Sequence, residues 1–288
     1  MRITGYLMSL IALLTGVVGA LLRRQEVASI FDPHSGLAER GAGISIALMA
    51  FSFAVVLLLF GLSLLVSRQP SPASVVTFDG GLFGTLLLSA LGLIVFIFAA
   101  LEAMSLLESG ELFAQNGAFL AQNNAPIPLS AVRLGAAGLS GLALILMAIL
   151  GPRGINVAIP STVPVFWICI WLIVSHIDRA SNPVLLSYVY NLFALAALLL
   201  ALYYIAGYAF RQNRPGRLVF TCSAAVYFTG VTMGDDLTLY TRGTFLALAA
   251  TVLLYQLALS KELARPRWRE IPYMERDVEH WYNEDSHE

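Results

Sequence analysis

Carboxylates and a histidine follow three of the chain's apolar segments, and these residue types bind divalent metals. Imidazole nitrogen and carboxylate oxygen suit zinc or manganese, at distances of about 2.0–2.3 Å. The candidate metal ligands are Glu102, His176, Asp178, Asp235 and Asp236. If the three segment ends converge, they predict a metal-dependent membrane enzyme with an outward-facing site.

The spacing of these residues also allows a plainer interpretation. His176 and Asp178 are two residues apart, so they do not share one face of a helix, and the sequence has no HExxH pattern. Polar side chains at helix ends also keep loops in water without binding any ligand. Glu102 in particular either faces water at the membrane interface or pairs with Arg133 or His176.

Four residues of one long apolar segment are candidate ligand-binding residues: Tyr188, Asn191, Tyr204 and Tyr208. Tyr188 and Asn191 are spaced i, i+3, and Tyr204 and Tyr208 are spaced i, i+4, so each pair occupies one helix face. They predict a polar, aromatic wall of a ligand pocket. In the alternative interpretation the tyrosines form two interfacial aromatic belts, and Asn191 hydrogen-bonds to another helix.

Motifs of established catalytic or cofactor sites are missing from the sequence. It contains no GxSxG, no P-loop, no DxxD pair and no CxxC. The two cysteines, Cys169 and Cys222, lie inside apolar runs, and their number excludes a disulfide scaffold or a cysteine-based zinc site. The net charge of −1 gives no basis for nucleic-acid binding. We therefore expect no cofactor and no nucleic-acid partner. The missing motifs also favour a protein that is not an enzyme.

Membrane helices must position these side chains. The segment 183–210 contains no charged side chain and is longer than the roughly 20 residues that a helix needs to cross a bilayer. The whole chain is 58% hydrophobic and 12% charged, with a mean hydropathy of +0.77, whereas soluble domains have about 25% charged residues. Hydropathy predicts eight spans, at 3–22, 43–66, 82–101, 131–150, 161–177, 183–210, 217–233 and 243–260.

The predicted fold is all-α, a polytopic membrane bundle of eight helices over residues 1–260. Seven or six spans stay open as alternatives, because 161–177 and 217–233 are only weakly apolar. Residues 261–288 are expected to form a largely disordered cytoplasmic tail. No ionisable side chain lies at the centre of a predicted span, which argues against pumps, proton-coupled carriers and voltage-gated channels.

Basic residues set the predicted orientation. With eight spans both termini lie on one side, and this side collects most of the basic residues, including Arg214 and Arg217. The positive-inside rule then puts both termini in the cytoplasm. The pair Arg23-Arg24 falls on the opposite side and is the main exception. Because this pair directly follows a full-length apolar run, we expect a retained helix rather than a cleaved signal peptide.

Several short motifs lie between residues 180 and 236. They are NPVLL at 182–186, YVY at 188–190, LLALYY at 199–204, AGYAF at 206–210 and RPGR at 214–217. With these motifs the segment resembles a family of uncharacterised polytopic membrane proteins from anaerobic Gram-positive bacteria. Members of that family carry no assigned activity, so the resemblance implies a multi-pass protein of a bacterial cytoplasmic membrane and no particular substrate.

Three hypotheses for the function follow from the sequence. The first is a membrane-embedded binding or sensing module, or an accessory subunit of a membrane complex, in which the fifth to seventh spans form the working part. The second is a small-solute transporter or facilitator with a neutral, polar path through the same spans. The third is the metal-dependent enzyme described above. The expected partners are the lipid bilayer and, for an accessory subunit, another membrane protein.

Overall fold

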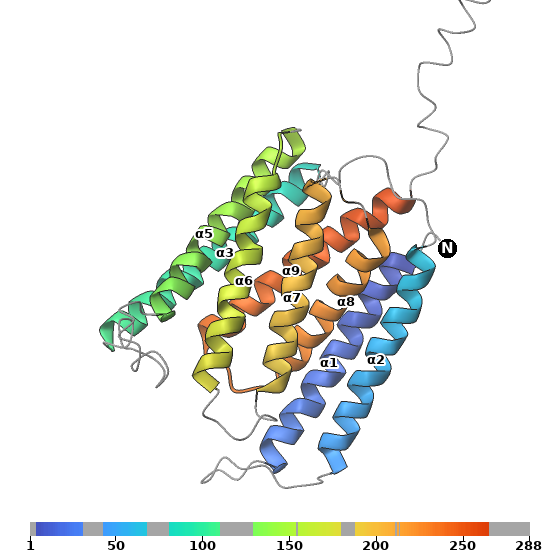
Figure 1. Cartoon of the computed structure of the whole chain (residues 1–288). Coiled ribbons are helices and arrows are strands. Elements are labelled where there is room, and N and C mark those ends of the chain that lie inside the picture. The colour runs from blue at the N-terminus through green and yellow to red at the C-terminus, as the bar shows by residue number, and fades with distance from the viewer. Residues whose placement is uncertain are drawn as a thin grey trace, which may run out of the picture.

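A computed structural model describes residues 4–30, 43–67, 81–109, 129–153, 155–179, 188–210, 212 and 214–264. All regular structure in these ranges is helical (Figure 1). The helices are α1 (Thr4–Ile30), α2 (Gly43–Ser67), α3 (Gly81–Glu108), α5 (Leu129–Leu150), the short 3₁₀ helix η1 (Gly151–Arg153), α6 (Ala158–Arg179), α7 (Val189–Ala209), α8 (Pro215–Thr232) and α9 (Leu239–Ala264).

Seven of these helices are long and apolar enough to cross a membrane. The predicted all-α, multi-pass membrane bundle is therefore confirmed. The described helix that does not meet the criterion is α8, which corresponds to the weak predicted span 217–233. It runs through the bundle beside the others (Figure 1), and 14 of its 18 residues are buried. Because α8 is enclosed by α1, α2, α7 and α9, it has little need for an apolar surface that contacts lipid.

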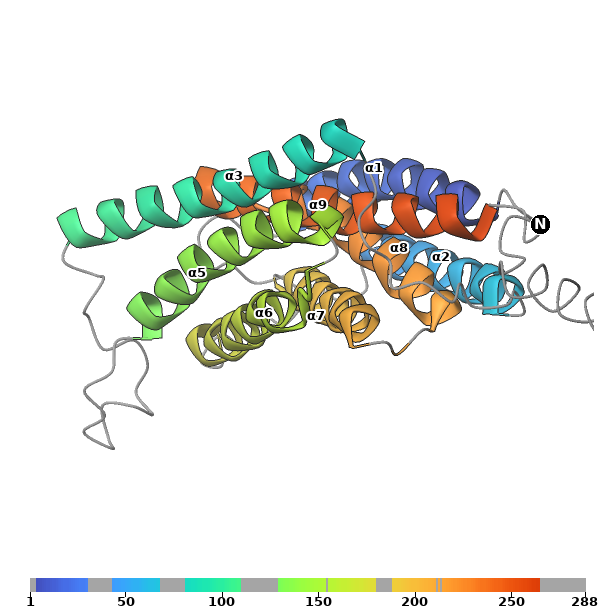
Figure 2. The same ribbon diagram turned by 90° about the horizontal axis from the view of Figure 1, so that it is seen from above.

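The helices pack as a ring with two additional members. The helices α3, α5, α6, α7, α8 and α9 each contact the next, and α9 also contacts α3 (Figure 2). The helices α1 and α2 pack together against α8. The start of α1 lies beside the end of α9, where the Gln256 side-chain nitrogen is 3.5 Å from the Gly5 carbonyl oxygen. Both ends of the described helical chain therefore lie at one end of the bundle.

Close approach of backbones at glycine sets two of the helix crossings. A Cβ atom added to Gly230 of α8 would lie 2.8 Å from the Gly16 Cα of α1. A Cβ atom added to Gly141 of α5 would lie 2.7 Å from the Gly92 carbonyl oxygen of α3. Small residues allow such tight crossings in membranes, where packing rather than water exclusion drives helix association.

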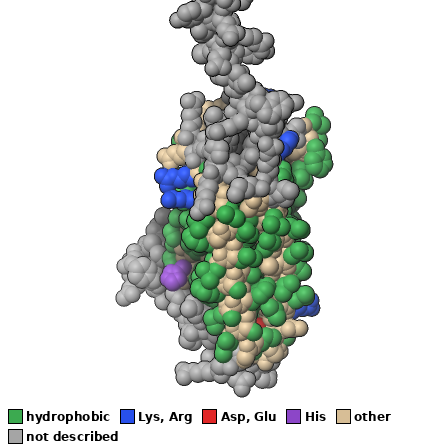
Figure 3. Space-filling view, turned by 90° about the vertical axis from the view of Figure 1, so that its right-hand side faces the viewer, with side chains coloured by type: hydrophobic (Ala, Val, Ile, Leu, Met, Phe, Trp, Pro, Cys, Tyr) green, Lys and Arg blue, Asp and Glu red, His purple; other side chains and the backbone are tan. Residues whose placement is uncertain are grey.

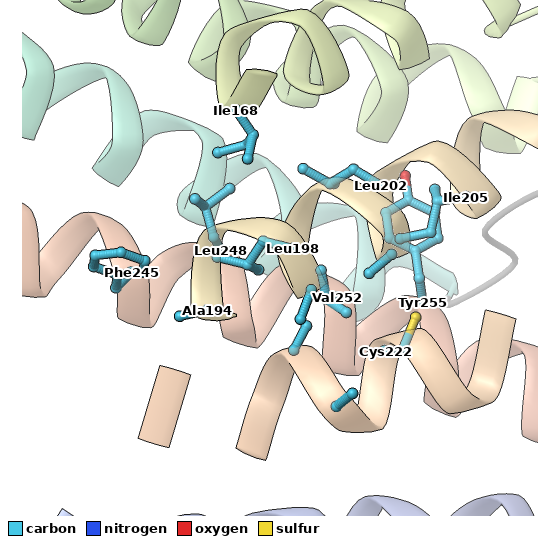
Figure 4. Close-up of a cluster of buried hydrophobic side chains, with 14 of the residues drawn as sticks. Ile168, Ala194, Leu198, Leu202, Ile205, Cys222, Phe245, Leu248, Val252 and Tyr255 are labelled. Atoms are coloured by element: carbon cyan, nitrogen blue, oxygen red, sulfur yellow. The ribbon is translucent and has the colours of Figure 1, made fainter. Parts of the chain in front are cut away.

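The helix surfaces divide into a lipid-facing side and an apolar core. Hydrophobic side chains cover the middle of the outer face (Figure 3), and examples are Leu14 and Phe53, which are 60% and 66% exposed. Inside the ring Ile168, Leu198 and Leu248 are fully buried and pack against one another's helices (Figure 4). The centres of α6, α7 and α9 thus meet through apolar side chains.

Several helix boundaries differ from the predicted ones, and α1 and α3 end at Ile30 and Glu108 rather than at residues 22 and 101. The predicted span 161–177 begins earlier, because α6 starts at Ala158, whose N–H donates a 2.9 Å hydrogen bond to the Asn156 side chain. The predicted span 183–210 begins later, because α7 starts at Val189. At the C-terminus α9 continues through residues 261–264 of the predicted tail, and residues 265–288 lie outside the described ranges.

Candidate functional site

A cluster of charged side chains is buried where α1 meets the connection between α8 and α9. The charge cluster, as we call it, consists of Arg23, Glu26 and Asp235. Arg23 Nη1 lies 2.7 Å from Glu26 Oε2, and Arg23 Nε lies 2.5 Å from Asp235 Oδ1. Arg23 is 0%, Glu26 1% and Asp235 8% exposed. Ionised groups this deeply buried are stable only when they are paired and hydrogen-bonded.

Neighbouring helices complete the surroundings of the charge cluster. From α2, Ser45 Oγ donates a 2.5 Å hydrogen bond to Glu26. From α7, the Tyr190 ring centroid lies 5.2 Å from the Arg23 guanidinium carbon, a distance suited to a cation–π contact. From α9, Arg242 donates a 3.2 Å hydrogen bond to the Asp235 carbonyl oxygen. The cluster therefore connects α1, α2, α7 and α9 through one polar centre.

The position of Arg23 corrects the sequence interpretation. Hydropathy predicts that Arg23 and Arg24 follow the first span together, outside the membrane bundle. Instead α1 continues to Ile30, so that Arg23 is buried and neutralised while Arg24 is exposed. A buried, paired arginine carries little weight as a topology signal, which removes much of the conflict with the positive-inside rule.

The sequence carries a signal for this cluster that the hydropathy reasoning missed. The buried residues of α1 include Gly5, Ala12, Gly19 and Glu26, which follow one another at intervals of seven residues. Gly16 and Arg23 are also buried and have the same spacing. A seven-residue repeat marks one packed helix face. Arg23 and Glu26 both lie on this face, at the i, i+3 spacing of an ion pair.

A second ion pair connects α3 and α5. Arg133 Nη2 lies 2.6 Å from Glu102 Oε1, and each side chain is 15% exposed. The Arg133 guanidinium carbon also lies 5.7 Å from the Trp171 ring centroid of α6. Of the alternatives left open for Glu102, the structure therefore contains the pair with Arg133.

Glu102→Gln is expected to lower the free energy of unfolding by about 1–2 kcal/mol, because it weakens a charge-assisted hydrogen bond that is mostly shielded from water. Thermal unfolding of the purified protein in detergent measures the change. Glu108→Gln is the control, because Glu108 is exposed on the same helix and should change stability by no more than about 0.5 kcal/mol. Equal losses in the two variants would contradict a stabilising role for the pair.

The remaining predicted metal ligands do not gather among the described side chains. His176 and Asp236 are exposed, and the side chain of Asp178 lies outside the described part. Glu102 and Asp235 each contact an arginine. Within the described residues no three His, Cys, Asp or Glu side chains are grouped to hold a metal ion. The metal site stays a prediction without geometric support from these ranges.

The four predicted ligand-binding residues of α7 occupy different environments. Tyr188, Asn191 and Tyr208 are buried, at 9%, 3% and 3% exposed. The Asn191 side-chain oxygen and the Tyr208 hydroxyl have no hydrogen-bond partner among the described atoms. Tyr204 is half-buried and lines a pocket. The ligand-binding role of these residues stays a prediction, for which Tyr204 has the most suitable position.

That pocket lies between α6, α7 and the start of α8, and we call it the arginine pocket. It has a volume of about 390 Å³. Its apolar and aromatic walls include Phe166, Tyr203 and Tyr204, and its polar part includes Arg214 and Arg217. Both arginines are exposed, and neither forms an ion pair with a described carboxylate. The sequence interpretation uses these two arginines to orient the chain and as part of the RPGR motif, and it does not place them in a binding site.

The backbone beside the arginine pocket also carries partial positive charge. Arg214 is the N-cap residue of α8, and no side chain caps this helix end. Pro215 occupies the first turn, where its missing N–H costs nothing. The unpaired N–H groups of a helix N-terminus favour a nearby anion.

Comparison with known proteins adds no further identification: no family model, no curated protein and no solved structure matches the chain. The fold and its apolar surface define a multi-pass membrane protein. The resemblance over residues 180–236 to a bacterial family stays a prediction.

Proposed function

We propose that this protein is a membrane-embedded binding module whose ligand occupies the arginine pocket. The observation that carries the proposal is the pocket itself, formed by α6, α7 and the start of α8. Its volume of about 390 Å³ falls within the range of about 300–1,000 Å³ that is typical of small-molecule sites. These helices correspond to the fifth to seventh predicted spans.

The apolar core next to the pocket supports binding rather than passage through the bundle. A transporter of polar solutes needs a polar path across the middle of the membrane. Ile168, Leu198 and Leu248 pack at the centres of α6, α7 and α9, and all three are fully buried (Figure 4). A ligand in the arginine pocket would therefore meet an apolar wall in the direction of this core.

The basic residues near the pocket support an orientation. Arg214 and Arg217 lie at the end of the bundle where α7 ends and α8 begins, and Arg153 follows α5 at the same end. Basic residues concentrate on the cytoplasmic side of membrane proteins. We therefore propose that the arginine pocket faces the cytoplasmic side of a bacterial cell membrane.

Photocrosslinking tests whether the pocket holds a ligand. Benzoylphenylalanine replaces Phe166 in one variant and Phe53 in another, because these phenylalanines are 68% and 66% exposed on different helices. Crosslinking in cells followed by mass spectrometry should detect one enriched small molecule at position 166, and at position 53 only the bulk lipid mixture.

A pocket-filling substitution makes this experiment specific. Gly207 lines the arginine pocket, and a Cβ atom there has ordinary contact only with the Gln212 carbonyl oxygen at 3.8 Å. Gly207→Trp should abolish the enriched product at position 166. Gly61→Trp is the control, since a Cβ atom at Gly61 meets nothing within 4 Å. Identical products at positions 166 and 53, or no response to Gly207→Trp, would refute the proposal.

A further inference from the structure

We infer that the ligand of the arginine pocket is an anionic phospholipid, whose phosphate is bound by Arg214 and Arg217; this inference rests on the binding function proposed above. The inference names the chemical class of the ligand and the two side chains that select it. It follows from the charge at one part of the pocket and from the apolar, lipid-facing character of the other.

The charge argument starts from the arginines of the bundle that have partners. Arg23 and Arg133 bind carboxylates, and Arg242 donates to a backbone carbonyl. Arg214 and Arg217 line a cavity instead, and no described carboxylate lies within ion-pair distance of either. Guanidinium groups bind phosphate oxygens through paired, charge-assisted hydrogen bonds. A phosphate is therefore the group that fits the polar part of the pocket.

The spacing of the two arginines suits a single bound group. Arg214 is the N-cap residue of α8 and Arg217 lies in its first turn, and both line the same pocket. The uncapped N-terminus of α8 adds partial positive charge at the same place. Two cations and a helix terminus thus act on one position, which selects for negative charge rather than for a neutral polar group.

The apolar part of the pocket indicates a lipid rather than a free anion. Phe166, Tyr203 and Phe210 line it and are 68%, 55% and 52% exposed. Phe166 and Tyr203 belong to helices that are apolar enough to span the membrane. Phe166 lies about two turns into α6 and Tyr203 lies in the second half of α7, so these exposed rings are placed to contact acyl chains below the head groups. A phospholipid can place its phosphate on the arginines and its acyl chains along this aromatic surface.

Lipid binding to the purified protein tests the inference. Native mass spectrometry in detergent compares dioleoylphosphatidylglycerol, which is anionic, with dioleoylphosphatidylcholine, which is zwitterionic. The wild-type protein should bind the anionic lipid about thirtyfold more tightly, the ratio expected for two arginines at the head-group level. Arg214→Gln combined with Arg217→Gln should remove this preference. Arg153→Gln is the matched control, because Arg153 is exposed near the same end but does not line the pocket.

The possible outcomes separate this inference from the proposed function. Equal binding of the two lipids, or an equal loss of preference in Arg153→Gln, would overturn the inference. Competition by inorganic phosphate would show that the site takes a free anion and would also overturn it. In each case the proposed function survives if Gly207→Trp still removes the crosslinked ligand at position 166. Thermal unfolding tests whether each variant is folded. If the double variant is unfolded, the single variant Arg217→Gln takes its place in the comparison.

Discussion

Arg23→Met is expected to lower the free energy of unfolding by about 3–5 kcal/mol, the range measured when one partner of a buried ion pair is removed. Methionine retains most of the side-chain length, so the change removes charge with little loss of volume. Glu26 and Asp235 would then be left close together, 1% and 8% exposed, without the guanidinium that neutralises them. Thermal unfolding in detergent, followed by circular dichroism, measures the effect.

The neighbouring residue provides a matched control for this prediction. Arg24 is adjacent in sequence but exposed, so Arg24→Met should change stability by no more than about 0.5 kcal/mol. Combining Arg23→Met with Glu26→Gln and Asp235→Asn should recover part of the loss, because the combined variant buries no unpaired charge. If Arg23→Met and Arg24→Met destabilised the protein equally, the charge cluster would have no special stabilising role.

Gly230→Leu is expected to cost about 3 kcal/mol or more, at the upper end of the usual overpacking range. A Cβ atom at Gly230 would lie 2.8 Å from the Gly16 Cα and 3.1 Å from the Gly16 carbonyl oxygen. Backbone atoms cannot rotate away as a side chain can, so α1 and α8 must separate. The same thermal measurement applies, and cysteine crosslinking between α1 and α8 reports whether the two helices have moved apart.

A glycine with free space around it is the control for this second prediction. A Cβ atom added to Gly61 of α2 would meet no other atom within 4 Å, so Gly61→Leu should leave stability within about 0.5 kcal/mol of the wild type. A small effect of Gly230→Leu, similar to that of Gly61→Leu, would contradict the close crossing of α1 and α8.

The helices could be predicted because the bilayer leaves the backbone few choices. Each N–H and C=O group in hydrocarbon needs a partner within its own segment, so a long apolar run must be helical. Segments such as 43–66 and 131–150 therefore appear as α2 and α5 with small changes at their ends. One of the two weak predicted spans, 217–233, corresponds to α8, whose polar composition matches its enclosed position.

The polar sites were harder to predict because their partners are distant in sequence. Asp235 is recognisable as a carboxylate at a helix end, but nothing local to it indicates that Arg23 lies beside it. Tyr204, predicted as part of a pocket wall, lines the arginine pocket. Arg214 and Arg217 are interpreted in the sequence as orientation signals and as part of the RPGR motif, and neither interpretation indicates a pocket. Hydropathy measures how hydrophobic a segment is, and it does not indicate which faces of separate helices are in contact.

The long separation between Arg23 and Asp235 has a consequence for how the protein is made. These residues are 212 positions apart, so α1 enters the membrane long before the ribosome has produced Asp235. During that interval Glu26 is the nearby counter-charge on α1 itself. α8 is the described helix that does not meet the length and hydropathy criterion for a membrane span, and we expect it to insert against α1 and α2, which precede it in the chain and contact it. Translation therefore has to pass α9 before the first helix can make all of its contacts with the described helices α2, α8 and α9, and we expect an insertase or chaperone that shelters α1 during this interval to raise the yield of folded protein.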